Sequence, residues 1–264
     1  MAWASSQKEV RAQQIEQLEK QLGEAKTDSS KAQILASLAT VSLEEGEAEE
    51  SISYANRSMD LSKNTSDLRL LSALARAYKQ EKEYASALNY YLQAQQQLSG
   101  MDQPQKLASM NMEIGELYKE WGILEKAVEY FQPALEGWIE LEKREKAVVA
   151  LRELARSHTE LGDYEKALQY SQSRLEYFGE DESDLPERLE PLKSISDLHI
   201  RLNNPEEALE AQGQILSIYQ TLEDSSGISS AHNNIGFLNK RMKRLEESLK
   251  SFEQSLEYSK DPSP

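Results

Sequence analysis

A phrase of small residues recurs six times along this chain of 264 residues. In each copy an apolar residue precedes a small residue, and a second small residue comes twelve positions after the first. The six pairs are Ala39 with Ser51, Ala75 with Ala87, Gly115 with Ala127, Ala155 with Ala167, Ser196 with Ala208, and Gly236 with Ser248. The second members lie 36, 40, 40, 41 and 40 positions apart. A fixed period in this range predicts stacked supersecondary units, because no single unit can bury its apolar face alone.

Turn residues fall in the same phase as the small residues. Gly and Asn tolerate the left-handed conformation that closes a helix, and carboxylates favour the first turn of the next helix. Pro205 stands where a first helical position is expected. The sequence therefore predicts a series of helix pairs, whose first helices end near Gly46, Lys82, Gly122, Gly162, Asn203 and Lys243.

The predicted organisation has three parts. Residues 1–28 hold one helix, which we interpret as a cap on the stack; a degenerate repeat and a coiled-coil linker are the alternatives. Residues 29–259 form the repeat array, and residues 260–264 are a tail. The six predicted repeats span about 32–66, 68–105, 108–146, 148–186, 189–227 and 229–259.

The residues that carry the period also carry a resemblance. Gly115, Tyr118, Gly122, Ala127 and Ala134 resemble a tetratricopeptide repeat, and the likeness extends over residues 32–259. The repeats are longer than the family standard of about 34 residues, and in this they resemble kinesin light chains and bacterial peptide-sensing regulators. The resemblance implies an all-α fold, a right-handed α-solenoid of six helix-turn-helix repeats plus the N-terminal helix. It also implies that first helices line a concave face that binds extended peptides.

Three residues depart from the pattern. Arg174 and Ile215 occupy the position that Ala94 and Ala134 hold in other repeats, so we expect adjusted packing there. Pro133 falls inside a second helix, where it removes one hydrogen bond.

Charge and composition limit the partners. The chain has 46 acidic and 30 basic residues, a net charge of −16. This disfavours nucleic acid and anionic membrane surfaces, which bind through clustered Lys and Arg. No stretch approaches the roughly 18 apolar residues of a membrane span, and no signal peptide is visible. The sequence as written predicts a cytoplasmic protein; if it is an excised sensor fragment, the prediction becomes periplasmic or extracytoplasmic.

The predicted ligand-binding residues lie on the first helices, at positions that the resemblance places on the concave face. Arginines there present fork-shaped donors to carboxylates, and an asparagine amide suits a peptide backbone because it donates and accepts. The alternative is that these are solvated residues with local salt bridges, such as one to Glu153. The candidates are Arg69, Arg76, Arg152, Arg156, Lys193, Asn233 and Asn234.

No catalytic constellation is visible in the sequence. The chain has no cysteine, no Gly-rich phosphate loop, no paired histidine–glutamate zinc motif and no nucleophile elbow. His158 and His199 share a position, but no third ligand accompanies them, so we expect both to pack at helix crossings. We therefore predict no enzymatic activity, no cofactor and no metal.

The last helix carries a second kind of candidate site. Leu249, Phe252 and Leu256 are spaced i, i+3, i+7 and no polar capping helix follows. Because a solenoid needs a solvating cap, we expect this face to contact another copy, a downstream domain or the tail.

The leading functional prediction is a non-catalytic scaffold that holds a protein or extended peptide segment, with a role as the sensory module of a bacterial signalling protein. A peptide-responsive allosteric regulator and a structural assembly adaptor are the alternatives.

Overall fold

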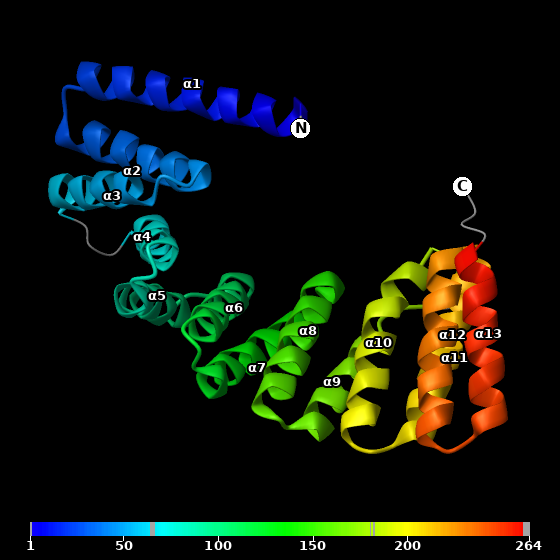
Figure 1. The fold of residues 1–264 in the computed structure, drawn as a ribbon. Coiled ribbons are helices and arrows are strands. Elements are labelled where there is room, and N and C mark those ends of the chain that lie inside the picture. The colour runs from blue at the N-terminus through cyan, green and yellow to red at the C-terminus, as the bar shows by residue number, and fades with distance from the viewer. Residues whose placement is uncertain (1, 64–66, 180, 182, 261–264) are drawn as a thin grey trace. The chain divides into compact units, whose positions relative to one another are not determined.

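A computed structural model describes residues 2–63, 67–179, 181 and 183–260, and of residues 2–9 and 260 only the backbone. Every regular element among these residues is an α-helix (Figure 1). The helices are α1 (Ala2–Glu24), α2 (Asp28–Glu45), α3 (Ala48–Ser62), α4 (Leu68–Gln80), α5 (Tyr84–Ser99), α6 (Pro104–Glu120), α7 (Leu124–Glu140), α8 (Arg144–Leu161), α9 (Tyr164–Leu175), α10 (Leu185–Arg201), α11 (Pro205–Thr221), α12 (Ser225–Arg241) and α13 (Leu245–Lys260).

The predicted all-α repeat fold is confirmed. The even-numbered helices α2 to α12 are the first helices of the hairpins, and the odd-numbered helices α3 to α13 are the second helices. Helix α1 lies within the predicted N-terminal segment, and its role as a cap stays a prediction. The predicted tail lies outside the described residues except for Lys260.

The turns inside the hairpins repeat one geometry. The residue after each first helix or one further on has a positive φ at all six predicted positions: 88° at Gly46, 60° at Lys82, 82° at Gly122, 79° at Gly162, 62° at Asn203 and 62° at Lys243. In each turn the next residue donates its N–H to the carbonyl five positions back, as Glu83 does to Tyr78 at 2.8 Å. This bond satisfies a carbonyl that the helix end leaves without a partner.

The small residues lie where the two helices of a hairpin cross. Ser51, Ala87, Ala127, Ala167 and Ala208 are fully buried. The Ser51 hydroxyl donates to the Ala39 carbonyl at 2.7 Å, and the Ser248 hydroxyl donates to the Gly236 carbonyl at 2.8 Å. In both hairpins the serine side chain contacts the backbone of the facing helix. Because the helices approach this closely, only small residues fit at the crossing.

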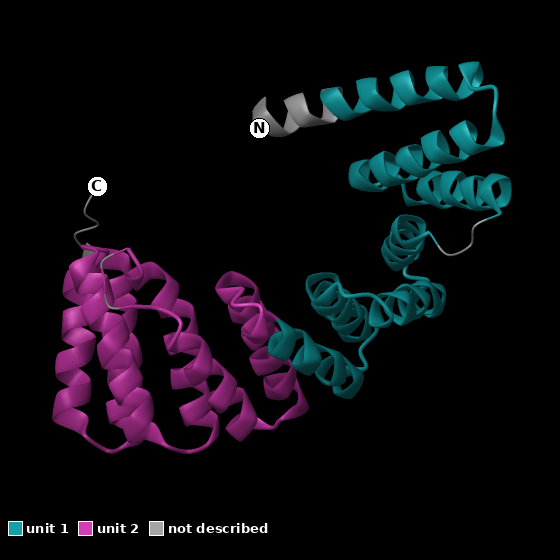
Figure 2. Cartoon of the chain, turned by 180° about the vertical axis from the view of Figure 1, so that it is seen from behind, with its two compact units in different colours: residues 1–137 teal, residues 138–264 magenta. Residues whose placement is uncertain are grey.

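The chain forms two compact units, residues 1–137 and 138–264, with the boundary inside α7 (Figure 2). In the first unit α1 packs on α2, and an apolar cluster runs through α2 to α6. In the second unit each helix from α8 to α13 packs on the next. Leu192, Ile215 and Ala231 form a cluster there that joins α10, α11 and α12.

Aromatic rings add a second layer to the hairpins. Tyr78 stacks on Tyr90, Tyr118 on Tyr130, and His158 on Tyr170, with ring centroids 5.6, 5.5 and 5.4 Å apart. Each pair is separated by twelve positions, like the small residues. The expected packing of His158 at a helix crossing is therefore confirmed.

Candidate functional site

Successive first helices present charged side chains that meet across repeats. Arg76 on α4 reaches Glu113 on α6, and Arg156 on α8 reaches Glu190 on α10. The side chains of Arg76 and Arg156 are each about half exposed, at 53% and 54%. We call these exposed sides of α2, α4 and α6, and of α8, α10 and α12, the first-helix faces of the two units.

The first-helix face of the first unit is dominated by carboxylates. Arg76 donates Nε to Glu113 at 3.0 Å and makes a second contact with the same carboxylate through Nη2. This bidentate pair raises the pKa of Arg76. Lys79 lies 3.6 Å from Glu116 and 2.9 Å from Glu120. A cavity of about 450 Å³ lies beside these residues.

Tyr91 forms the floor of that cavity and is 1% exposed. Burial, and then the nearby Glu113 carboxylate, raise the pKa of its hydroxyl. All three carboxylate partners of Arg76 and Lys79 come from α6, so the two cations are already paired before any ligand arrives. The cavity therefore favours a ligand that adds positive charge or neutral donors.

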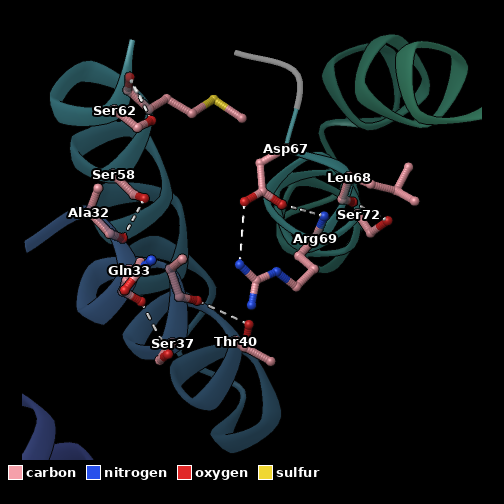
Figure 3. Close-up of polar contacts among 12 residues, drawn as sticks. Ala32, Gln33, Ser37, Thr40, Ser58, Ser62, Asp67, Leu68, Arg69 and Ser72 are labelled. Carbon is pink, nitrogen blue, oxygen red and sulfur yellow. Dashed lines mark hydrogen bonds and ion pairs between the residues drawn. The ribbon is translucent and has the colours of Figure 1, made fainter. Parts of the chain in front are cut away.

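Arg69 lies apart from this cavity, at the start of α4 (Figure 3). Its side chain is 74% exposed, and Nη2 lies 3.5 Å from Asp67, the residue that caps α4. In Figure 3 the guanidinium extends toward Thr40 on α2. Ser58 meanwhile donates to the Ala32 carbonyl at 2.7 Å and ties α3 to α2. Arg69 thus stands over a small polar cavity of about 290 Å³.

The first-helix face of the second unit gathers arginines around two carboxylates. Glu153 is buried at 5% exposure, 3.2 Å from Arg152 Nε and 4.0 Å from Arg156 Nη1. Arg156 Nη2 also donates to Glu190 at 3.3 Å. Glu190 in turn contacts Arg174, which comes from α9. The predicted residues Arg152 and Arg156 therefore lie together, in a network that includes Arg174 from a second helix.

Between α8 and α10 a cavity of about 340 Å³ opens on the same face. Lys193 lines it and lies 5.4 Å from the centre of the Tyr219 ring. Asp197 lines it too, and burial raises the pKa of its carboxyl, an effect that Arg201 opposes. This part of the face therefore presents charges of both signs.

Asn233 and Asn234 are exposed on α12 but differ in surroundings. Asn233 lines a cavity of about 420 Å³ with several serines and Tyr258. Asn234 donates its amide to Gln212 at 3.4 Å, and Gln212 donates to Ser196 at 3.0 Å. Asn234 is thereby tied to α11, whereas Asn233 extends toward a hydroxyl-rich cavity.

The three predicted contact residues of α13 do not share one face. Leu249 and Leu256 are 61% and 58% exposed, as is Leu245 at 68%. The Phe252 ring instead packs edge-on against Phe237, with centroids 5.2 Å apart, and covers Gly236. The exposed apolar surface of α13 therefore consists of Leu245, Leu249 and Leu256, and what contacts it stays a prediction.

The prediction named Glu153 as a salt-bridge partner of the arginines but missed Glu113, which pairs with Arg76. Glu113 lies on α6, 37 positions from Arg76. Among the described residues, no group of three or more His, Asp or Glu side chains is arranged to hold a metal ion. No described helix is long and apolar enough to cross a membrane.

The sequence matches tetratricopeptide-repeat family models in three places. The matched residues are 70–102, 106–180 and 229–262, which together make up more than half of the chain. No curated protein matches this chain in sequence.

Solved structures resemble the fold. A STAND protein with a tetratricopeptide-repeat sensor from Pyrococcus horikoshii matches 94% of this chain with a TM-score of 0.64 and 18% identity; the chain spans 40% of that protein. The apo form of RapI matches 92% of this chain and 88% of its own, at a TM-score of 0.57 and 17% identity.

A putative kinesin light chain with nearly identical TPR-like repeats from Podosopora anserina covers 72–75% of this chain in two structures. The first of these has a TM-score of 0.56 and 16% identity, and 97% of it is covered. At these identities the likeness concerns the fold alone. The repeat phase, the turn geometry and the three sequence matches agree, and the chain belongs to the tetratricopeptide-repeat family.

Proposed function

We propose that the chain is a scaffold that binds a protein or an extended peptide segment on its first-helix faces. The observation that carries this proposal is the alignment of exposed charged side chains on successive first helices, with Arg76–Glu113 and Arg156–Glu190 crossing from one repeat to the next. An open cavity adjoins each ion pair, of about 450 Å³ beside Arg76 and Glu113 and of about 340 Å³ beside Arg156 and Glu190. Side chains of an extended segment fit into such spaces while its backbone runs across the helices.

The two faces favour segments of different charge. In the first unit Glu44, Glu113, Glu116 and Glu120 outnumber the two lining cations. In the second unit Arg156, Lys193 and Arg201 balance three acidic residues in the lining, and Arg152 lies next to them. We therefore infer that acidic side chains of a ligand contact the second unit and basic ones the first.

The experiment uses two fluorescein-labelled dodecapeptides of opposite charge and reads their affinity by fluorescence anisotropy. Arg152→Glu with Arg156→Glu should weaken the acidic peptide by roughly tenfold or more, since each reversal replaces attraction with repulsion. Far-UV circular dichroism checks that helicity is unchanged. Arg11→Glu, a single reversal of charge on α1, serves as the control. Undiminished affinity of the acidic peptide for the double variant would remove this face from consideration.

A sensory role in a signalling protein is the finer form of this proposal. It rests on the fold likeness to the STAND sensor and to RapI. Small-angle scattering discriminates it from the adaptor alternative: a regulator changes its dimensions when a short peptide binds, whereas an assembly adaptor binds folded partners and keeps its dimensions.

A further inference from the structure

One position in the second helices differs from repeat to repeat in a way that changes the space beside it. It lies seven residues after the second small residue and is Ala94, Ala134 and Ile215 in three repeats, all buried. In the fourth repeat it is Arg174. Helix α9, which carries it, has 12 residues, whereas α3, α5, α7, α11 and α13 have 15 to 17. A long side chain thus stands where others have a small one, and the helix ends one residue later.

A cavity of about 570 Å³ adjoins Arg174, between the start of α8, the end of α9 and the start of α10. Val148, Phe178 and Pro186 supply its apolar lining. This volume lies within the range of about 300–1,000 Å³ typical of small-molecule sites. The two other hairpins with a polar residue at this position, Ser58 and Ser255, also have a cavity here, of about 290 and 420 Å³, but lined mostly by polar side chains.

The wall that carries Phe178 is held by specific hydrogen bonds. Arg188 Nη1 donates to the carbonyls of Phe178 at 3.0 Å and Gly179 at 3.2 Å. The Gly179 N–H donates to Asp184 Oδ2 at 2.9 Å. Arg188 and Asp184 therefore hold the backbone of Phe178 and Gly179 in place, and Phe178 lies at the edge of the cavity.

Arg174 lines this cavity and belongs to a cluster of three arginines, of which Arg152 and Arg156 lie outside the lining. Arg152, Arg156 and Arg174 share two carboxylates, Glu153 and Glu190. Arg174 is 11% exposed in its side chain, and its buried Nε has no acceptor among the described residues. The pKa of Arg174 is lowered to about 10, first by burial and then by Arg152 and Arg156, whereas Glu153 opposes the shift.

The remaining charged groups of the lining are solvated or occupied. Arg144, Glu145 and Glu187 are exposed at the rim, where water screens them. Asp184 is bonded to the Gly179 backbone. Glu190 keeps Arg156 as a partner if a ligand takes its place on Arg174. The inner end of the cavity therefore carries one guanidinium, held by Glu190, beside an apolar surface.

We propose that this cavity binds an organic monocarboxylate with an apolar body, of the size of a medium-chain fatty acid. Its carboxylate replaces Glu190 on the Arg174 guanidinium, and its chain lies against Val148, Phe178 and Pro186. The carboxylate takes over the contact that Glu190 makes with Arg174, and the apolar body lies on the apolar lining rather than in water. The inference does not depend on peptide binding at the first-helix faces, because the cavity is lined mainly by other residues.

The test is isothermal titration of the full chain with sodium decanoate below its micelle concentration, beside decanol, decylamine and acetate. We expect decanoate to bind and the other three to bind at least tenfold more weakly. Arg174→Ala should weaken decanoate by roughly ten- to a hundredfold, the usual range for a lost charge-assisted hydrogen bond. This variant restores the residue found at Ala94 and Ala134, so it should fold. Arg244→Ala, which removes an exposed arginine just before α13, is the control and should bind as the unchanged chain does.

Several results would overturn the proposal. These are the absence of decanoate binding at millimolar concentration, equal affinity in Arg174→Ala, decanol binding as tightly as decanoate, or a preference for decylamine. A hexapeptide with a C-terminal leucine that binds here when decanoate does not would overturn the choice of a small acid. If Arg174→Ala loses helicity, Arg174→Gln keeps the side-chain length without the charge, and Phe178→Ala tests the apolar wall. Retained affinity in both of these variants would also contradict the assignment.

Discussion

Adding one methyl group at Gly115 tests whether the hairpins are held by close helix crossings. A Cβ atom at this position would lie 2.5 Å from two ring carbons of Phe131. Real side chains do not approach so closely, and the Phe131 ring is fully buried. We therefore expect Gly115→Ala to force α6 and α7 apart or to displace the ring.

The magnitude follows from two opposing effects. Alanine in place of glycine inside a helix stabilises by about 0.5–1 kcal/mol, because the unfolded chain loses freedom. Overpacking a filled core costs about 1–3 kcal/mol, and a buried aromatic ring facing two short contacts belongs at the upper end. We expect Gly115→Ala to lower the free energy of unfolding by about 2 kcal/mol, which is the difference between these two effects.

Gly213 provides a matched control. It lies inside α11, and a Cβ atom there would meet nothing within 4 Å. Gly213→Ala should therefore stabilise the chain by about 0.5–1 kcal/mol. Because the helix-propensity gain is common to both variants, the difference between their free energies of unfolding, about 3 kcal/mol, reports the clash alone.

The assay is urea unfolding followed by far-UV circular dichroism and by tryptophan fluorescence. Two probes are needed because repeat arrays can lose two-state behaviour. Trp121 reports on the region of the change, since it stacks near Tyr118 with ring centroids 6.2 Å apart. Gly115→Ala with Phe131→Leu should recover part of the loss, and the double-mutant cycle then gives the coupling energy.

A specific result would refute this reasoning. In the second repeat the equivalent residues are Ala75 and Tyr91, and both fit, with exposures of 0% and 1%. If Phe131 can take a comparable orientation, Gly115→Ala will be as stabilising as Gly213→Ala. Equal shifts in the urea midpoint for the two variants would show that the crossing is adaptable.

Three further outcomes can be checked with the same unfolding assay. Leu249→Glu should change the free energy of unfolding by less than about 0.5 kcal/mol because the side chain is exposed, whereas Phe252→Glu should lower it by several kcal/mol because the ring covers Gly236; equal effects would contradict the inward orientation of Phe252. Ser51→Ala should cost about 0.5–1.5 kcal/mol by removing the bond to a backbone carbonyl, and a neutral result would show that the bond contributes nothing. Burial lowers the pKa of His158 below its ordinary 6.5, so the unfolded chain binds a proton more readily; this part of the stability is complete above pH 6.5 and is lost as the pH falls through the lower folded value. His158→Gln should therefore reduce the loss of stability on acidification, measured from urea midpoints across that range, and an unchanged pH profile would contradict this origin.

The hairpin fold could be predicted because its signals are local. The pairing of Ala39 with Ser51, and of every later small pair, needs only a spacing of twelve and a residue without bulk. Turn residues such as Gly162 and Asn203 mark positive φ by their own chemistry. All six turns and all six helix crossings could be predicted from the amino-acid sequence without any knowledge of long-range contacts.

The site was less accessible because it depends on which way neighbouring helices face. Arg76 was identified as a candidate, but its partner Glu113 lies 37 positions away, and only the stacking of successive hairpins brings the two side chains together. Phe252 shares a helical stripe with Leu249, yet its ring turns inward since Gly236 leaves room for it. The departure at Arg174 was visible in the sequence. The cavity beside it could not be predicted, because its lining comes from the ends of three different helices.

The turns inside the hairpins are positions where the stability of the chain can be increased. Lys82 and Lys243 adopt a conformation that costs an ordinary side chain about 1 kcal/mol and glycine very little. These two turns lie in different compact units, so changing Lys82 and Lys243 to glycine should raise the unfolding temperature additively. The stability of the array can thus be raised at two turns that lie outside both of its proposed ligand-binding surfaces.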